Sequence, residues 1–225
     1  MLAVTHGPLV RAELFGDVAR EDGHEVVEWE LPVQGPPARD GFDAVMVFGG
    51  RMNVGEEAVY PWLEDEYELL REWVAEEKPL LGVCLGAQTL AHATGGRVGR
   101  APQWKAGFYE VALTDAGRED PVVGVLPSRF EALLANAFEF DPAPAAERLA
   151  ATDAQQQAFR IGSRAWGVQF HPEARRDQIL AWWSDGRALP RPLPELEQDL
   201  ESRLPAWHEL GRKLCRAFLA AAGAD

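Results

Sequence analysis

Cysteine is scarce in this chain, and its two cysteines form no pattern. Cys84 and Cys215 are the only two among 225 residues, and neither lies in a CxxC motif or beside a histidine cluster. Disulfide scaffolds and zinc sites need closely spaced cysteines or histidines. The sequence therefore predicts no bound metal, and each cysteine has to be explained by itself.

Long hydrophobic runs and positive charge are also lacking. No apolar segment reaches the roughly 18 residues of a membrane span, and the N-terminus has no basic segment followed by an apolar one. The chain has only 22 basic residues and 36 acidic ones, and its net charge of −14 repels phosphate backbones and anionic lipid. We expect a cytoplasmic protein with no nucleic-acid or membrane partner.

The chain does have the composition of a globular protein, with 47% hydrophobic and 26% charged residues. In its first half, short apolar runs alternate with helical patterns, which is typical of an α/β fold with a mostly parallel sheet flanked by helices. A Pro/Gly-rich loop is expected over residues 32–41, and the acidic residues of the helix over 60–78 are expected to face solvent. The predicted strands are residues 1–6, 24–31, 42–50 and 79–84.

The second half of the chain has a different pattern. Shorter strand-like pieces begin near residue 97 and predict an antiparallel or mixed extension of the sheet. From residue 174 onward the pattern is helical. We expect an α/β domain over residues 1–190 and a helical C-terminal extension over 191–225 that packs on the same domain. The tryptophans of this region suit either the core or an interface between two copies of the chain: Trp182, Trp183 and Trp207.

The segment LLGVCLGAQTLAHATGG places Cys84 where a predicted strand turns into a predicted helix. The carboxyl ends of parallel strands line the ligand crevice of such sheets, and Gly82 and Gly86 permit a sharp turn there. A helix N-terminus favours a thiolate. Cys84 is therefore either a nucleophile or a small core residue. Cys215 has no such surroundings and is expected to be inert.

A nucleophile needs a base, and the base needs an orienting group. The segment WGVQFHPE supplies both, because His171 follows an apolar strand-like run and Glu173 lies two positions later, on the same side of an extended chain. The alternative is a surface loop with an incidental histidine and glutamate. His6, at the end of the first predicted strand, is a weaker candidate for the same crevice.

This combination resembles the class I glutamine amidotransferases, which hydrolyse an amide with a Cys-His-Glu triad and release ammonia. The resemblance is carried by FGGRMNV, YPWL, GVCLGAQTLAHATGG and AFRIGSRAWGVQFHPE. It is strongest to stand-alone relatives of the amidotransferase domain of GMP synthase. It implies a flavodoxin-like fold, no cofactor, an amide substrate such as glutamine, and a separate synthase subunit that accepts the ammonia.

The resemblance also implies residue roles. Cys84 corresponds to the nucleophile, His171 to the acid and base, and Glu173 to the group that orients His171. The backbone N–H groups of Gly50 and Leu85 correspond to the oxyanion hole. Two residues correspond to substrate-binding positions: Gly49 and Gln88.

Three positions depart from the family pattern. Leu134 and Asn136 stand where many relatives have a histidine and an aspartate, and Lys105 stands where relatives carry an acidic residue. A buried α-ammonium needs a partner. Three hypotheses therefore remain: a glutamine-type amide hydrolase, an amidase for a compound without the α-ammonium, and a binding module that is non-catalytic or activated by a partner.

Overall fold

A computed structural model describes residues 1–184, 186 and 188–223. Within them, the core is a nine-stranded sheet with the strand order β2-β1-β3-β4-β9-β8-β7-β5-β6. The α/β architecture predicted from the sequence is confirmed. The strands are β1 (Leu2–Thr5), β2 (Val27–Glu30), β3 (Val45–Val47), β4 (Leu80–Val83), β5 (Arg97–Leu113), β6 (Arg129–Asp141), β7 (Glu147–Ala151), β8 (Gln156–Ile161) and β9 (Ala165–Val168).

One half of the sheet is parallel. Strands β2, β1, β3, β4 and β9 all run in the same direction, and β1, β3, β4 and β9 are fully buried. Burial on both faces explains why these strands read as continuous apolar runs rather than alternating ones. Their carboxyl ends therefore lie along one edge, where residues that follow different strands come together.

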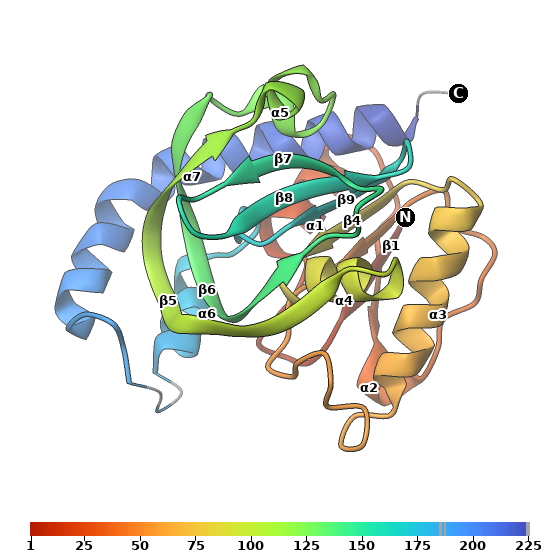
Figure 1. Cartoon of the computed structure of the whole chain (residues 1–225), viewed down its shortest axis with the longest axis horizontal. Coiled ribbons are helices and arrows are strands. Elements are labelled where there is room, and N and C mark those ends of the chain that lie inside the picture. Colours follow the sequence, from red (N-terminus) through yellow and green to blue (C-terminus); the bar gives the residue numbers. More distant parts are fainter. Residues whose placement is uncertain (185, 187, 224–225) are drawn as a thin grey trace.

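The other half is the antiparallel extension that the sequence indicated. Strands β8, β7, β5 and β6 pair antiparallel, and β8 joins this half to β9. Strands β5 and β6 form a long curled ribbon in Figure 1, with a register shift between Arg100 and Lys105. This shift bends the ribbon near the carboxyl edge of the parallel strands.

Helices cover both faces of the sheet (Figure 1). Helices α3 and α4 contact each other, as do α1 and α7, and the two pairs contribute to two separate clusters of buried apolar residues. None of the described helices is long and apolar enough to cross a bilayer. The helices are α1 (Glu13–Glu21), α2 (Leu31–Gln34), α3 (Trp62–Ala75), α4 (Leu85–Ala93), α5 (Asp115–Glu119), α6 (Arg176–Trp183) and α7 (Leu193–Ala222), with a 3₁₀ turn at Val123–Val125.

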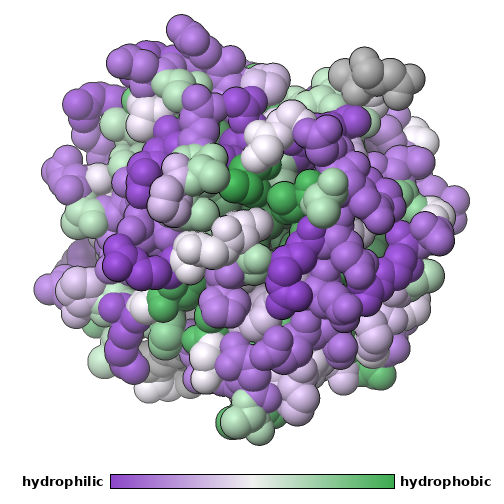
Figure 2. Space-filling model, turned by 45° about the vertical axis from the view of Figure 1, so that its right-hand side comes forward, coloured by the Kyte–Doolittle hydropathy of each residue, from purple (hydrophilic) through white to green (hydrophobic). Residues whose placement is uncertain are grey.

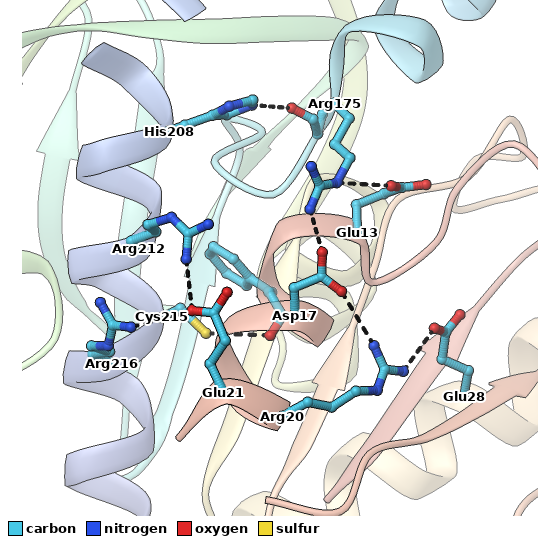
Figure 3. Close-up of polar contacts among 12 residues, drawn as sticks. Glu13, Asp17, Arg20, Glu21, Glu28, Arg175, His208, Arg212, Cys215 and Arg216 are labelled. Atoms are coloured by element: carbon cyan, nitrogen blue, oxygen red, sulfur yellow. Dashed lines mark hydrogen bonds and ion pairs between the residues drawn. The ribbon is translucent and has the colours of Figure 1, made fainter. Parts of the chain in front are cut away.

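Helix α7 packs along α1 through both apolar and charged contacts (Figure 3). Arg212 pairs with Glu21 at 2.8 Å, and the Cys215 thiol lies 3.7 Å from the carbonyl oxygen of Phe15. Burial, together with the charge of Asp22, raises the pKa of the Cys215 thiol to about 12. Cys215 is thus a core residue of this contact.

Two of the three tryptophans that the sequence singled out pack inside the chain, whereas Trp182 is half-buried and lines a cleft. Trp183 and Trp207 are each 2% exposed, and Trp207 stacks against Phe130. Hydrophilic residues dominate the face shown in Figure 2, with hydrophobic residues visible in a hollow near its middle.

Two expectations about local structure are wrong. The segment expected to be a loop instead begins within the short helix α2. Pro32 lies in the first turn of this helix, a position that suits proline. Glu66 of α3 does not face solvent: its side chain is completely buried, because it pairs with the equally buried His6. Helical periodicity cannot reveal a carboxylate that has a buried partner in another element.

Candidate active site

Cys84 lies at the sharp turn between β4 and α4. Its backbone has φ 54° and ψ −106°, a conformation that residues other than glycine rarely adopt. Its N–H donates to the carbonyl oxygen of Val168 on the neighbouring strand β9, at 2.8 Å. Strain of this kind persists only where the surrounding structure enforces it, and it is concentrated at functional sites.

Two glycines allow this turn. A Cβ atom on Gly82 would lie 2.4 Å from the carbonyl oxygen of Gly86, and one on Gly86 would lie 2.1 Å from the carbonyl oxygen of Val47. Both distances are far inside van der Waals contact with backbone atoms. The spacing of the glycines around Cys84 is therefore required by the close approach of α4 to strands β3 and β4.

His171 and Glu173 lie opposite Cys84, just after β9. Nδ1–H of His171 donates to Oε1 of Glu173 at 2.8 Å, and the two residues are 3% and 0% exposed. The backbone N–H of His171 donates to the carbonyl oxygen of Leu133 at 2.9 Å. The structure thus brings together the three residues that the sequence nominated as nucleophile, base and orienting group.

The charge state of His171 follows from its neighbours. Burial by itself lowers the pKa of His171, but attraction to a Cys84 thiolate and to Glu173, with hydrogen bonds to both, raises the pKa to about 10. The raised pKa favours the protonated form of the ring, which lies between Cys84 and Glu173. Such a pair can supply both a sulfur nucleophile and a proton for a leaving group.

Helix α7 supports the backbone around His171. Nε1–H of Trp207 donates to the carbonyl oxygen of His171 at 2.8 Å, and Nε2 of His208 lies 3.0 Å from the carbonyl oxygen of Ala174. Gly211 approaches so closely that a Cβ there would lie 2.2 Å from the carbonyl oxygen of Pro172. Sequence reasoning missed this role of the helix, because its apolar stripe only indicated packing.

Gly49 and Gly50 follow β3 and lie beside Cys84, Leu85 and His171. A Cβ on Gly49 would lie 3.2 Å from Cε1 of His171 and 3.6 Å from Cβ of Cys84, while one on Gly50 would lie 2.6 Å from Cδ2 of Leu85. Gly50 and Leu85 line one stretch of cleft together with Cys84. Gly50 and Leu85 therefore belong to the wall of the cleft next to Cys84.

The comparisons with known proteins agree with this geometry. The family model described as glutamine amidotransferase class-I matches residues 19–179. The chain belongs to the class I glutamine amidotransferase family. A glutamine amidotransferase-like protein, YfeJ, from Salmonella typhimurium is 32% identical over 109 residues, 46% of each chain. A subunit of the glutamine-hydrolyzing GMP synthase from Ignicoccus hospitalis is 30% identical over 161 residues, 69% of this chain and 79% of that one.

Solved structures show the same fold. A glutamine amidotransferase from Thermotoga maritima aligns over 99% of this chain and 97% of its own chain, with a TM-score of 0.80 and 24% identity. A glutamine amidotransferase from Methylobacillus flagellatus aligns over 100% of this chain and 96% of its own, with a TM-score of 0.89 and 18% identity. Among the sequence relatives, however, the chain covers less than half of the Salmonella protein and 23% of a GMP synthase from Aeropyrum pernix.

Gln88 lies on the first turn of α4 and is 3% exposed. Its Nε2 donates to the carbonyl oxygen of Phe138 and to Oε1 of Gln169, both at 3.1 Å. These bonds fix the amide group in the wall of the cleft near Cys84.

The three departures from the family pattern have different surroundings. Leu134 is fully buried in the core. Lys105 lies over the ring of Tyr109, 5.1 Å from its centroid, and does not line the cleft. Only Asn136 lines the cleft beside Cys84. Its Nδ2 donates to the Phe138 carbonyl oxygen at 2.9 Å, while its buried Oδ1 has no partner within the described structure.

Arg51 lines the cleft beside Cys84, and Arg100 lines an adjoining pocket that shares Arg51 and Trp104 with it. Trp104 and Trp182 form apolar walls, and the Trp182 ring lies 4.6 Å from that of His171. No group of three His, Cys, Asp or Glu residues in the described part of the chain is arranged to hold a metal ion.

Proposed function

We propose that the protein hydrolyses the side-chain amide of glutamine, or of a γ-glutamyl-like compound, through a thioester on Cys84 and releases ammonia. The observation that carries the proposal is the buried contact of Cys84 with His171, which Glu173 orients. Membership of an amidotransferase family supports the same chemistry. Thiolate, imidazole and backbone donors suffice for acyl transfer, so no cofactor is invoked.

In the proposed first half-reaction the Cys84 thiolate attacks the amide carbon, and the carbonyl electron pair moves onto oxygen. The N–H groups of Gly50 and Leu85 stabilise this oxyanion. As the oxyanion collapses, the C–N bond breaks, and His171 gives its proton to the departing nitrogen, which leaves as ammonia. The acyl group remains on sulfur as a thioester.

In the second half-reaction water attacks the thioester, and His171 takes a proton from that water. Collapse of the second oxyanion breaks the C–S bond, which returns the thiolate and releases a carboxylate. The ammonia needs an acceptor, and a separate synthase subunit is the proposed one. This part of the proposal draws on a relative that is itself named as one subunit of a GMP synthase.

Ammonia release from glutamine, with Cys84→Ala as the control, tests the proposal. The variant is expected to lose at least about a thousandfold in kcat/KM, because the residues of a triad act as a unit. Mass spectrometry after treatment with an electrophilic glutamine analogue should find the adduct on Cys84. Equal rates in the two proteins would refute the nucleophile assignment, and no turnover with any amide, with or without lysate, would favour the binding-module alternative.

A second candidate is an amidase for substrates that carry a carboxylate but no α-ammonium. It is favoured by two departures from the family pattern: Leu134 is buried in the core and Asn136 lines the cleft beside Cys84, so neither supplies a negative charge for an α-ammonium. Glutaramate, which is glutamine without its amino group, separates the two candidates. A higher kcat/KM for glutaramate supports the second, and a higher value for glutamine supports the first.

Asn136→Asp provides an independent comparison of the two candidates, because it places a carboxylate in the cleft without changing the size of the side chain. A substrate with an α-ammonium gains an opposite charge, so its KM should fall. A substrate that carries only a carboxylate meets a like charge, so its KM should rise.

A further inference from the structure

A second buried histidine–glutamate pair lies on the other side of the Gly49–Gly50 segment. His6 follows β1 and Glu66 lies on α3, and both side chains are completely buried. Nε2 of His6 contacts Oε2 of Glu66. The reaction proposed above uses neither residue, so the pair needs another explanation.

The other ring nitrogen of His6 contacts the candidate oxyanion loop directly. Nδ1–H donates to the carbonyl oxygen of Gly49 at 2.8 Å. The ring also stacks on Trp62, with the centroids 5.3 Å apart and the planes at 15°. A stacked ring that is bonded at both nitrogens has a fixed orientation, and so does the carbonyl group that it holds.

A doubly protonated ring satisfies both contacts, because one ring nitrogen faces a carbonyl oxygen and the other a carboxylate oxygen. Burial lowers the pKa of His6, but the charge of Glu66 and the hydrogen bonds to Glu66 and Gly49 outweigh burial and raise it. A buried ion pair is weak evidence for stability, since the cost of removing two charges from water offsets most of their attraction. Its position is therefore more informative than its energy.

The orientation of the Gly49 carbonyl determines the direction of the Gly50 N–H. The two groups belong to one planar trans peptide and point in opposite directions. A carbonyl held towards His6 turns the Gly50 N–H away from His6. Gly50 also lines the cleft together with Cys84.

We propose that His6 and Glu66 are positioning residues that hold the Gly49–Gly50 peptide so that the Gly50 N–H is available to the oxyanion. This inference rests on the proposed function. A side chain at position 6 that cannot donate to the Gly49 carbonyl oxygen would free the peptide to rotate, and that oxygen would then face the developing negative charge. The pair thus acts through the backbone, without contact with the substrate.

The test compares His6→Leu, which removes the donor, with His6→Asn, whose amide N–H can replace the Nδ1–H. For His6→Leu we expect kcat to fall about a hundredfold, the effect of losing one oxyanion donor, with KM nearly unchanged. His6→Asn should recover most of this loss. Glu66→Gln should lower kcat less than His6→Leu does.

Two controls separate positioning from general damage. Asp120→Asn also neutralises a buried carboxylate, one bonded to the N–H groups of Val122 and Val123, and it should leave kcat unchanged. Alkylation of Cys84 by iodoacetamide attacks a saturated carbon and needs no oxyanion hole, so its rate should be unchanged in His6→Leu. Unchanged kcat, a loss carried by KM, or equally slowed alkylation would overturn the inference. If His6→Leu does not fold, His6→Asn and Glu66→Gln carry the same comparison.

Failure of the proposed function has a different signature, which is a wild-type protein without any Cys84-dependent ammonia release. In that case crystal structures of the wild type and of a folded position-6 or Glu66 variant decide the inference by themselves. A Gly49 carbonyl that rotates when the donor or its anchor is removed supports it. An unchanged peptide overturns it.

Discussion

Gly86→Ala tests the strand-to-helix turn at Cys84, because the substitution has two opposite effects on the free energy of unfolding. Alanine is favoured over glycine inside a helix by about 1 kcal/mol, so the substitution stabilises an unobstructed helix. At Gly86, however, the added Cβ would lie 2.1 Å from the carbonyl oxygen of Val47, a backbone atom of a buried strand that cannot rotate away.

Overpacking of this kind costs about 1–3 kcal/mol and occasionally more. Because the obstacle is backbone, we expect the upper end of the range and a net loss of about 2 kcal/mol in the free energy of unfolding. For a chain of this length that loss lowers Tm by about 4–8 °C. The displaced α4 should also carry Cys84 away from His171, so amide hydrolysis should fall with stability.

Urea unfolding of the wild type, Gly86→Ala and Gly16→Ala gives the measurement. Gly16 also lies in a helix, but its new Cβ would be 3.1 Å from Cβ of Ala12 and from the mobile end of Arg20. Its free energy of unfolding should stay within about 1 kcal/mol of the wild type. If Gly86→Ala is as stable as Gly16→Ala, the steric argument for the glycines around Cys84 is refuted.

Two further predictions concern His171 and the cysteines. The pKa of His171 is raised from 6.5 to about 10 in the folded protein, so its stabilising contribution is complete below pH 6.5 and is lost as the pH rises towards 10. The wild type should therefore have a higher free energy of unfolding than His171→Gln, and the difference should be larger at about pH 6 than at about pH 10.5. A difference that does not change with pH would contradict this. Iodoacetamide should modify Cys84 but not Cys215 in the native protein, because burial raises the pKa of the Cys215 thiol to about 12. Both should react in urea, and mass spectrometry that finds Cys215 modified under native conditions would count against its placement in the core.

Much of the parallel half of the fold is predictable because its signals are local. Buried parallel strands read as apolar runs, and the glycines around Cys84 mark a turn that few other residues permit. The same local reading picked out His171 and Glu173, which lie two residues apart. Their proximity to Cys84 could be inferred only indirectly, from the need of a nucleophile for a base and from the resemblance to a family, since they are far from it along the chain.

The contacts that sequence reasoning missed join distant elements. The helical pattern predicts that Glu66 faces solvent, but in the fold the end of β1 places His6 beside it. The two residues are 60 positions apart in the sequence. Lys105 was suspected of altering the substrate pocket, but the course of β5 and β6 directs it towards Tyr109. Periodicity assigns a residue to a face of its own element and gives no information about which residue of another element it meets.

The support that α7 gives to the His171 segment also bears on the order of events during protein synthesis. Cys84 and its turn leave the ribosome early, whereas Trp207 and Gly211, which contact the backbone of His171 and Pro172, leave late. A nascent chain therefore contains the thiol before its imidazole partner is fixed in place. Docking of α7 therefore completes the support of the His171 backbone as a late step, after the thiol is already present.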